Sequence, residues 1–172
     1  MDLSHAHPTH LQRLAETLWE ERHVVEQLLY RLTCAKLLLA TDQQRFVPDA
    51  LEEVEQTVDR LRQVEQLREG VVAEVAMSLG VGRDSLSLAE LATNAPSPWN
   101  DVFADHRKAF LSLAEAIEDT TAANRELASQ ALGHVRRAID ALSGTPATSA
   151  TYDAAGRTAV PTGVPVHLDR AL

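Results

Sequence analysis

The chain has 172 residues, which is long enough for one domain whose core needs neither a metal ion nor a disulfide. Aromatic residues make up only 4% of a chain that is 45% hydrophobic, so the core must consist mainly of Leu, Val, Ala and Ile, which favours helices over sheets. The formal net charge of −9 argues against binding to nucleic acid or to anionic membranes, because phosphate contacts require clustered Lys and Arg.

The cysteine count and the N-terminal sequence indicate a cellular compartment. Cys34 is the only cysteine, which excludes an intramolecular disulfide and favours a reducing environment. The opening MDLSHAHPTH has no basic region followed by an apolar one, so we expect no signal peptide. No apolar run approaches the roughly 18 residues that suggest a membrane span. These features predict a cytoplasmic protein without membrane insertion.

Apolar residues at helical spacing predict a first long helix over about residues 10–40. Thr9 and Gln12 fit a capping box at its start. One polar residue, Glu21, interrupts an apolar stripe that otherwise continues for about four heptads. Two series make up this stripe: Leu11, Leu18, Val25, Leu32 and Leu39, and Leu14, Leu28 and Ala35.

A second long helix is predicted over about residues 48–79. Pro48 suits the first turn of a helix, and the acidic residues that follow it favour a helix N-terminus. Gly80 ends the pattern, and two polar residues, Glu65 and Arg68, interrupt the apolar stripe in its middle. The stripe consists of Leu51, Val54, Val58, Leu61, Val72, Val75 and Leu79.

A short helix and a third long helix complete the predicted fold. Ser87 and Glu90 have the spacing of a capping box and predict a short helix near residues 87–93. Ser97 and Pro98 resemble the N-cap and first position of a helix that continues over about 98–142. The predicted fold class is therefore all-α, an antiparallel bundle of three long helices.

The apolar stripe of the third helix changes register along its length. Phe103, Phe110 and Ile117 share a face with Leu113 and Leu127. After Asn124 a different set of residues forms the stripe, which turns the apolar face away from its earlier partners. This later set consists of Leu132, Val135, Ile139 and Leu142. Because three helices around one seam leave room for a fourth, we expect the later stripe to lack a partner within the chain.

The composition changes again after the third helix. Beyond Ser143 the chain contains three prolines and no helical periodicity, which predicts a flexible tail. We therefore divide the chain into a helical domain, residues 1–144, and a tail, residues 145–172. One of only two tyrosines, Tyr152, lies in this tail, where it is either a bystander or a residue that a partner recognises.

The histidines give little support to a metal site. Glu20 and His23 form a single Glu-x-x-His, whereas a di-iron bundle needs two such motifs and two further glutamates. His5, His7 and His10 cluster near the N-terminus, where a frayed chain end is the simpler interpretation. We predict neither a metal ion nor another cofactor.

Enzymatic motifs are also lacking. His106 and His134 lie on the third helix, but HRKAF and HVRRA lack the Lys and Gly that follow a phosphorylated histidine in phosphotransfer bundles. We expect both imidazoles to be core or groove-lining residues, and Cys34 to be a buried small residue rather than a reactive thiolate. Since the sequence has no phosphate-binding glycine loop and no nucleophile elbow, we expect no catalytic residue and no enzyme.

Several stretches together resemble one known family. They are LWEERHVVEQLLYRL, VEQTVDRLRQVEQLRE, SPWNDVFADHRKAF, NRELASQAL and YDAAG, within about residues 10–157. This combination resembles the FlgN family, bacterial flagellar type III export chaperones for hook–filament junction proteins. Ala128, Ala131 and Gly133 depart from the leucine-rich pattern of that family.

The resemblance implies a function and a set of residues. It implies a helical chaperone that binds the C-terminal helical region of hook-associated proteins, of the FlgK and FlgL type, and presents them to the export apparatus. Tyr152 would contact the cytoplasmic domain of the export gate. The end of the third helix would bind the client through Leu127, Leu132, Val135, Ile139 and Leu142.

An alternative interpretation gives the same stripe a different partner. An ordinary core position or a homodimer seam would also place apolar residues at this spacing. The protein would then be a structural or regulatory helical module that self-associates and has no client. Under the chaperone interpretation we expect a monomer or a weak dimer when the client is absent.

Overall fold

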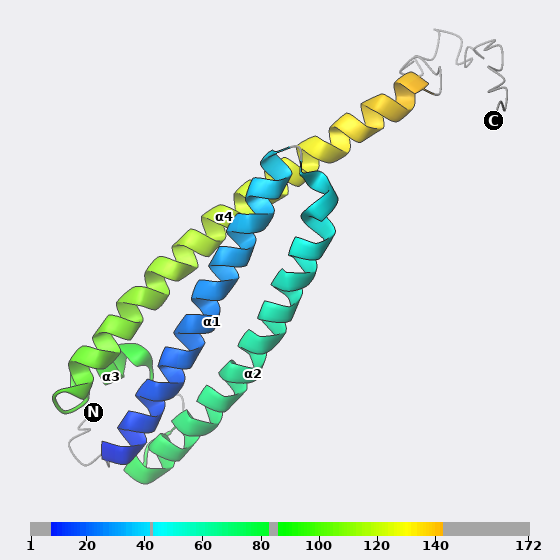
Figure 1. Ribbon diagram of the computed structural model, residues 1–172. Helices are drawn as coiled ribbons and strands as arrows, with labels where there is room; N and C mark the ends of the chain where they lie inside the picture. Colours follow the sequence, from blue (N-terminus) through cyan, green and yellow to red (C-terminus); the bar gives the residue numbers. More distant parts are fainter. Residues whose placement is uncertain (1–7, 42, 83–85, 143–172) are drawn as a thin grey trace, which may run out of the picture. The chain divides into compact units, whose positions relative to one another are not determined.

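The computed structural model describes residues 8–41, 43–82 and 86–142, and within these ranges the chain is all-α (Figure 1). The predicted fold class is thus confirmed. Among the described residues, no helix combines the length and hydropathy that a membrane span requires. The elements are α1 (Pro8–Ala40), η1 (Gln44–Phe46), α2 (Val47–Leu79), α3 (Leu88–Asn94) and α4 (Trp99–Leu142).

The chain divides into two compact units, residues 1–127 and 128–172, and α4 contributes to both. The first unit contains α1, α2, α3 and the larger part of α4. In the second unit the described residues are 128–142, the end of α4. The predicted tail, residues 145–172, lies outside the described residues, as do His5 and His7.

Local sequence signals account for several helix ends, although α4 begins at Trp99, so Ser97 and Pro98 are not its N-cap and first position. Ser87 and Glu90 form the predicted capping box: the Glu90 amide donates to Ser87 Oγ at 3.2 Å, and the Ser87 amide donates to Glu90 Oε2 at 3.3 Å. Gly80 ends α2 in the left-handed conformation, with φ of 65°. The box predicted at Thr9 is wrong, because α1 already begins at Pro8 and the Gln12 side chain donates to Glu16 instead.

Within the first unit, α1 and α2 form an antiparallel hairpin joined through η1 (Figure 1). Two partly exposed ion pairs join α1 to α2. Arg31 Nη1 lies 2.8 Å from Glu53 Oε2, and Arg13 pairs with Glu74. Because these side chains are about half exposed, each pair contributes only about 0–1 kcal/mol to stability. The alignment of the hairpin must therefore depend chiefly on the residues between the helices.

The portion of α4 in the first unit runs alongside α1 and in the same direction (Figure 1). Near its start, the ring of His106 lies 5.2 Å from that of Trp19 on α1. Further along, Asn124 Nδ2 donates a hydrogen bond to the Leu32 carbonyl oxygen at 3.0 Å. Asn124 is also the residue after which the apolar register of α4 is predicted to change, so this hydrogen bond lies close to that change.

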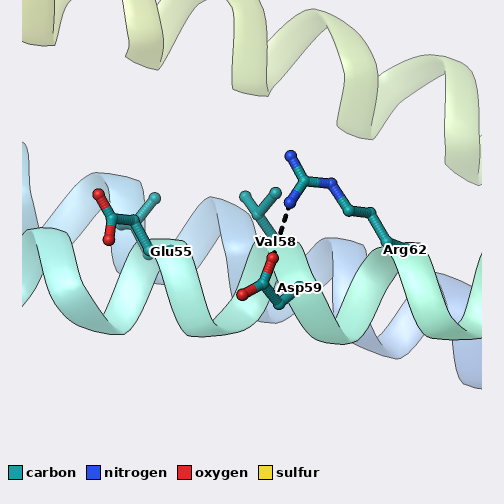
Figure 2. Close-up of a pocket in the computed structure, with 5 residues that line it drawn as sticks. Glu55, Val58, Asp59 and Arg62 are labelled. Carbon is teal, nitrogen blue, oxygen red and sulfur yellow. Dashed lines mark hydrogen bonds and ion pairs between the residues drawn. The ribbon is translucent and has the colours of Figure 1, made fainter.

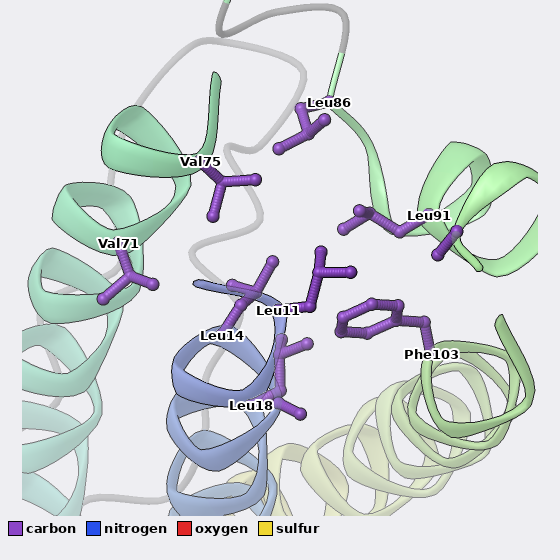
Figure 3. Packing of buried hydrophobic residues seen from close by; sticks show 10 residues of the cluster. Leu11, Leu14, Leu18, Val71, Val75, Leu86, Leu91 and Phe103 are labelled. Atoms are coloured by element: carbon purple, nitrogen blue, oxygen red, sulfur yellow. The ribbon is translucent and has the colours of Figure 1, made fainter. Parts of the chain in front are cut away.

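The apolar core gathers at one end of the first unit, where α3 joins the starts of α1 and α4 and the end of α2 (Figure 3). Phe103 and Leu11 are both fully buried there. The complete cluster consists of Leu11, Leu14, Ala15, Leu18, Val71, Val75, Leu86, Leu91, Ala95 and Phe103. Away from this end many apolar side chains are only half buried, including Val54 and Val58 of α2 and Ile117 of α4. Burial therefore anchors one end and leaves the rest of the unit more open.

Two of the polar residues that interrupt the predicted stripes form an ion pair between α1 and α2. Arg68 Nε lies 2.8 Å from Glu21 Oε2, and the Glu21 side chain is only 10% exposed. Burial raises the pKa of Glu21 above its ordinary 4.5, the nearby Glu65 raises it further, and Arg68 opposes both effects. The pair fixes which residue of α1 lies opposite which residue of α2, because a slipped hairpin would bury Glu21 without a counter-charge.

We predict that Arg68→Met lowers the free energy of unfolding by roughly 1–3 kcal/mol at pH 7, because the Glu21 carboxylate loses its partner. Water reaches the partly exposed Arg68, which places the effect toward the lower end of that range. The double variant Glu21→Leu/Arg68→Leu should recover most of the loss. Urea unfolding measures each value.

Arg62→Met is the matched control, since the Arg62–Asp59 pair is exposed on both sides. At acidic pH, the free energies of unfolding of Arg68→Met and of the parent chain should differ less. The reason is that Glu21, whose pKa is raised, takes up a proton in the folded state and no longer needs a counter-charge. A double variant less stable than Arg68→Met would contradict the assigned role.

Candidate functional site

Four of the five apolar residues predicted as a binding site lie on the exposed surface of the end of α4. We call these four residues, Leu132, Val135, Ile139 and Leu142, the α4 stripe. Their exposed fractions are 67%, 55%, 57% and 88% in chain order. Spacing of three and four residues places them along one side of the helix, within a length of about 15 Å. The described side chains thus form a narrow apolar surface open to solvent.

The remaining predicted site residues are placed differently. Leu127 is half buried and is the last residue of the first unit, whereas the α4 stripe belongs to the second. Tyr152 lies outside the described residues. The structure therefore groups four residues of the predicted set on one surface.

The surroundings of the α4 stripe are basic, although the whole chain is acidic. Residues 128–142 contain Arg136 and Arg137 against Asp140, which gives a net charge of +1 with neutral histidine. Arg136 follows the stripe residue Val135 and is exposed. His134 is exposed as well, so of its two expected positions the core is wrong, and a groove-lining position stays a prediction. An apolar stripe beside cationic side chains suits an amphipathic helix, bound through anchors at i, i+3 and i+7.

A small hollow between α1 and α4 is lined by a buried histidine, His106, for which the sequence predicted a core or groove-lining position but no neighbours. His106 is 2% exposed, as expected for a core imidazole, and stacks at 6.4 Å on the ring of Phe110. Trp19 meets it edge-on, remains 56% exposed itself, and carries the Arg22 guanidinium 5.1 Å from its ring centroid. Val102 and Asp105 complete the lining of the hollow, of about 110 Å³. In the sequence, the only indication of this contact is that Trp19 lies next to the apolar stripe of α1.

The electrostatics of His106 follow from this enclosure. Burial lowers the pKa of the imidazole below its ordinary 6.5, the Arg22 charge lowers it further, and Asp105 acts in the opposite direction. Neither ring nitrogen has a hydrogen-bond partner among the described residues. The folded protein therefore favours the neutral ring, and protonation opposes folding.

A larger hollow, of about 340 Å³, lies against α2 in the first unit (Figure 2). Val54 and Val58 form its apolar part, and Glu55, Asp59 and Arg62 form its polar part. Figure 2 shows the ion pair between Asp59 and Arg62, which measures 2.7 Å. Leu51 and Leu61 continue the same side of the helix, and Leu51 is 48% exposed. We call Leu51, Val54, Val58 and Leu61 the α2 face.

The described residues provide no constellation typical of catalysis. No group of three or more His, Cys, Asp or Glu side chains within 8–41, 43–82 and 86–142 is placed to hold a metal ion. Glu20 and His23 are both exposed on α1, and Cys34 is half buried. What the described surface offers is apolar helix faces with charged edges, which is the chemistry of protein binding.

A comparison with protein families places the chain in a known class. The family model described as FlgN protein matches residues 1–159. The chain belongs to the FlgN family. FlgN is a family of chaperones rather than of enzymes, so this FlgN protein is a chaperone of flagellar export. No curated protein and no solved structure gives a significant match.

We predict that the stability of this FlgN protein falls as the pH is lowered through about 6.5, because the unfolded chain binds a proton that buried His106 does not. The loss should level off below the depressed pKa of the folded state. In His106→Leu, the loss of stability that His106 causes below about pH 6.5 should be absent. Thermal unfolding between pH 7.5 and 5.5 measures the slope.

His134→Leu is the control, since His134 is exposed on the same helix. It should keep the pH dependence of the parent chain. An unchanged slope in His106→Leu would show that other groups cause the acid sensitivity.

Proposed function

We propose that this FlgN protein binds hook-associated proteins of the FlgK and FlgL type in the cytoplasm and delivers them to the flagellar export apparatus. Membership of the family supports the general role, a chaperone of flagellar export that binds export substrates. The identity of the clients comes from the motifs in helices α1, α2 and α4 that resemble junction-protein chaperones. In this proposal the C-terminal helical region of the client is the bound segment.

The observation that carries the proposal is the exposure of the α4 stripe, with Leu132 67% and Leu142 88% accessible. Exposed leucines cost free energy in water, and a client helix with an apolar side would cover them. The same contact would cover the apolar side of the client, which otherwise promotes its self-association. An interface of roughly 800 Å² per partner is ordinary for such a complex. Because the client must later leave, we expect a Kd between about 1 μM and 1 nM.

The proposal assigns a separate role to the segment after α4. Residues 1–144 form the helical chaperone domain and residues 145–172 a tail, in which Tyr152 contacts the cytoplasmic domain of the export gate. Two separate surfaces would let the chaperone keep its client while it meets the export apparatus. Tyrosine is among the residues that most often dominate binding energy in protein interfaces, which supports a recognition role for Tyr152.

We predict that Leu132→Asp/Ile139→Asp weakens client binding at least about 100-fold, because each charge would have to be buried against an apolar helix. Isothermal titration with a purified hook-associated protein measures the change, and circular dichroism checks that the helices remain. The matched control is His134→Asp/Ala141→Asp, which adds two acidic residues at the same spacing on another side of α4. Equal affinity of the stripe variant and the control would refute the assigned surface.

For Tyr152→Ala, we expect unchanged affinity for the client and weaker binding to the isolated cytoplasmic domain of the export gate. The reason is that removal of the phenol ring leaves the α4 stripe intact. Pull-down with the gate domain, together with client titration, separates the two effects. Loss of client affinity in this variant would assign the tail to the other partner.

The self-associating module is the competing candidate, and the exposed α4 stripe is compatible with it too. Light scattering discriminates between the two functions. A chaperone forms a 1:1 complex when the client is added, whereas the module remains a stable dimer that ignores the client.

A further inference from the structure

A second apolar surface, the α2 face, remains without an assigned role. Leu51 is 48% exposed, and Val54, Val58 and Leu61 are half buried. The hollow of about 340 Å³ beside Val54 and Val58 is lined by residues of α2 alone, on the side of that helix that faces the ribbon of α4 in Figure 2. Because Leu and Val at such positions gain free energy when covered, this face is suited to receive further apolar side chains.

The α2 face and the α4 stripe match in length and spacing. Each consists of four aliphatic residues separated by three, four and three positions along a helix. Both therefore extend over about 15 Å of helix. Two helices with apolar residues at such spacing pack by placing side chains of one between those of the other.

Their charges are opposite. Residues 51–62 of α2 carry Glu52, Glu53, Glu55 and Asp59 against Arg60 and Arg62, a net charge of −2. Residues 128–142 have a net charge of +1, from Arg136 and Arg137 against Asp140. Glu55 lines the hollow beside Val54, and Arg136 follows Val135 of the stripe. Complementary charges at the edges favour this pairing over the pairing of either surface with itself.

We propose that the occupant of the α2 face is a second copy of the chain, whose α4 stripe packs there. Two molecules would exchange this contact, with the stripe of each on the α2 face of the other, as in an isologous twofold dimer. The dimer covers the exposed leucines when no client is present. Competition between this dimer and the client rests on the proposed function. The contact between the two copies does not.

The expected association is weak. Each contact involves one short helical stretch, and two such contacts remain at the small end of specific interfaces. A Kd on the order of 10–100 μM lets a client of higher affinity take the stripe. Because charged edges contribute, the association should weaken as the salt concentration rises.

The test uses charge reversal in the full chain and sedimentation equilibrium over a range of concentrations. Arg136→Glu and, separately, Glu55→Arg/Asp59→Arg should each weaken self-association at least about 10-fold through like-charge contacts. An equimolar mixture of the two variants should associate as the parent chain does. In the mixed dimer one contact is charge-reversed on both sides and the other is the original pairing.

Three results would overturn the proposal: a parent chain that is monomeric up to about 0.5 mM, dimerisation that neither variant weakens, or a mixture that associates no better than its components. Val58→Asp addresses the apolar part of the contact and should also produce a monomer, with circular dichroism as the check on folding. A dimer that persists in folded Val58→Asp counts against the α2 face.

Client titration separates this inference from the proposed function. Glu55→Arg/Asp59→Arg leaves the α4 stripe intact, so it should bind a hook-associated protein at least as well as the parent chain. If this variant binds the client but dimerises normally, the docking surface is wrong and the chaperone function stands. If it becomes monomeric but no chain binds the client, the dimer stands and the proposed function fails.

Discussion

Burial of Phe103 among the leucines and valines of four helices is the contact on which the first unit depends. Phe103 and Leu11 are fully buried, and the starts of α1 and α4 meet the end of α2 and the short helix α3 around them. With few aromatic residues available, this cluster concentrates the apolar burial that stabilises the fold. Away from it, burial becomes partial, and the helices are left with faces that other molecules can use.

Polar residues inside the first unit determine alignment. The Glu21–Arg68 ion pair joins α1 to α2, and Asn124 bonds the backbone of α1 at Leu32. Aliphatic stripes alone would tolerate a shift of one heptad, because Leu and Val pack in many registers. A buried charge or amide is less tolerant, since it needs one particular partner. These polar contacts therefore specify which residues face each other, and so which apolar side chains remain half exposed.

The exposed surfaces explain how a protein with no catalytic machinery among its described residues can have a function. A chaperone needs an apolar surface that is stable in water without a client and available when a client arrives. In the proposed function the α4 stripe would meet the second need, because Leu132 and Leu142 are exposed. If the stripe binds a client, Arg136 and Arg137 beside it would favour acidic partners over neutral apolar ones.

The sequence by itself determined the helices, the Ser87 capping box and the change of register after Asn124, because each depends on residues within a few positions of one another. It also marked Glu21 and Arg68 as exceptions to the apolar pattern, and it carried the family motifs. Only the tertiary structure decided that Arg68 forms an ion pair with Glu21, that the ring of Trp19 packs edge-on against His106, and that a hollow lies beside Val58. These contacts join residues far apart in the chain, and helical periodicity gives the side that a residue occupies but not the residue opposite it.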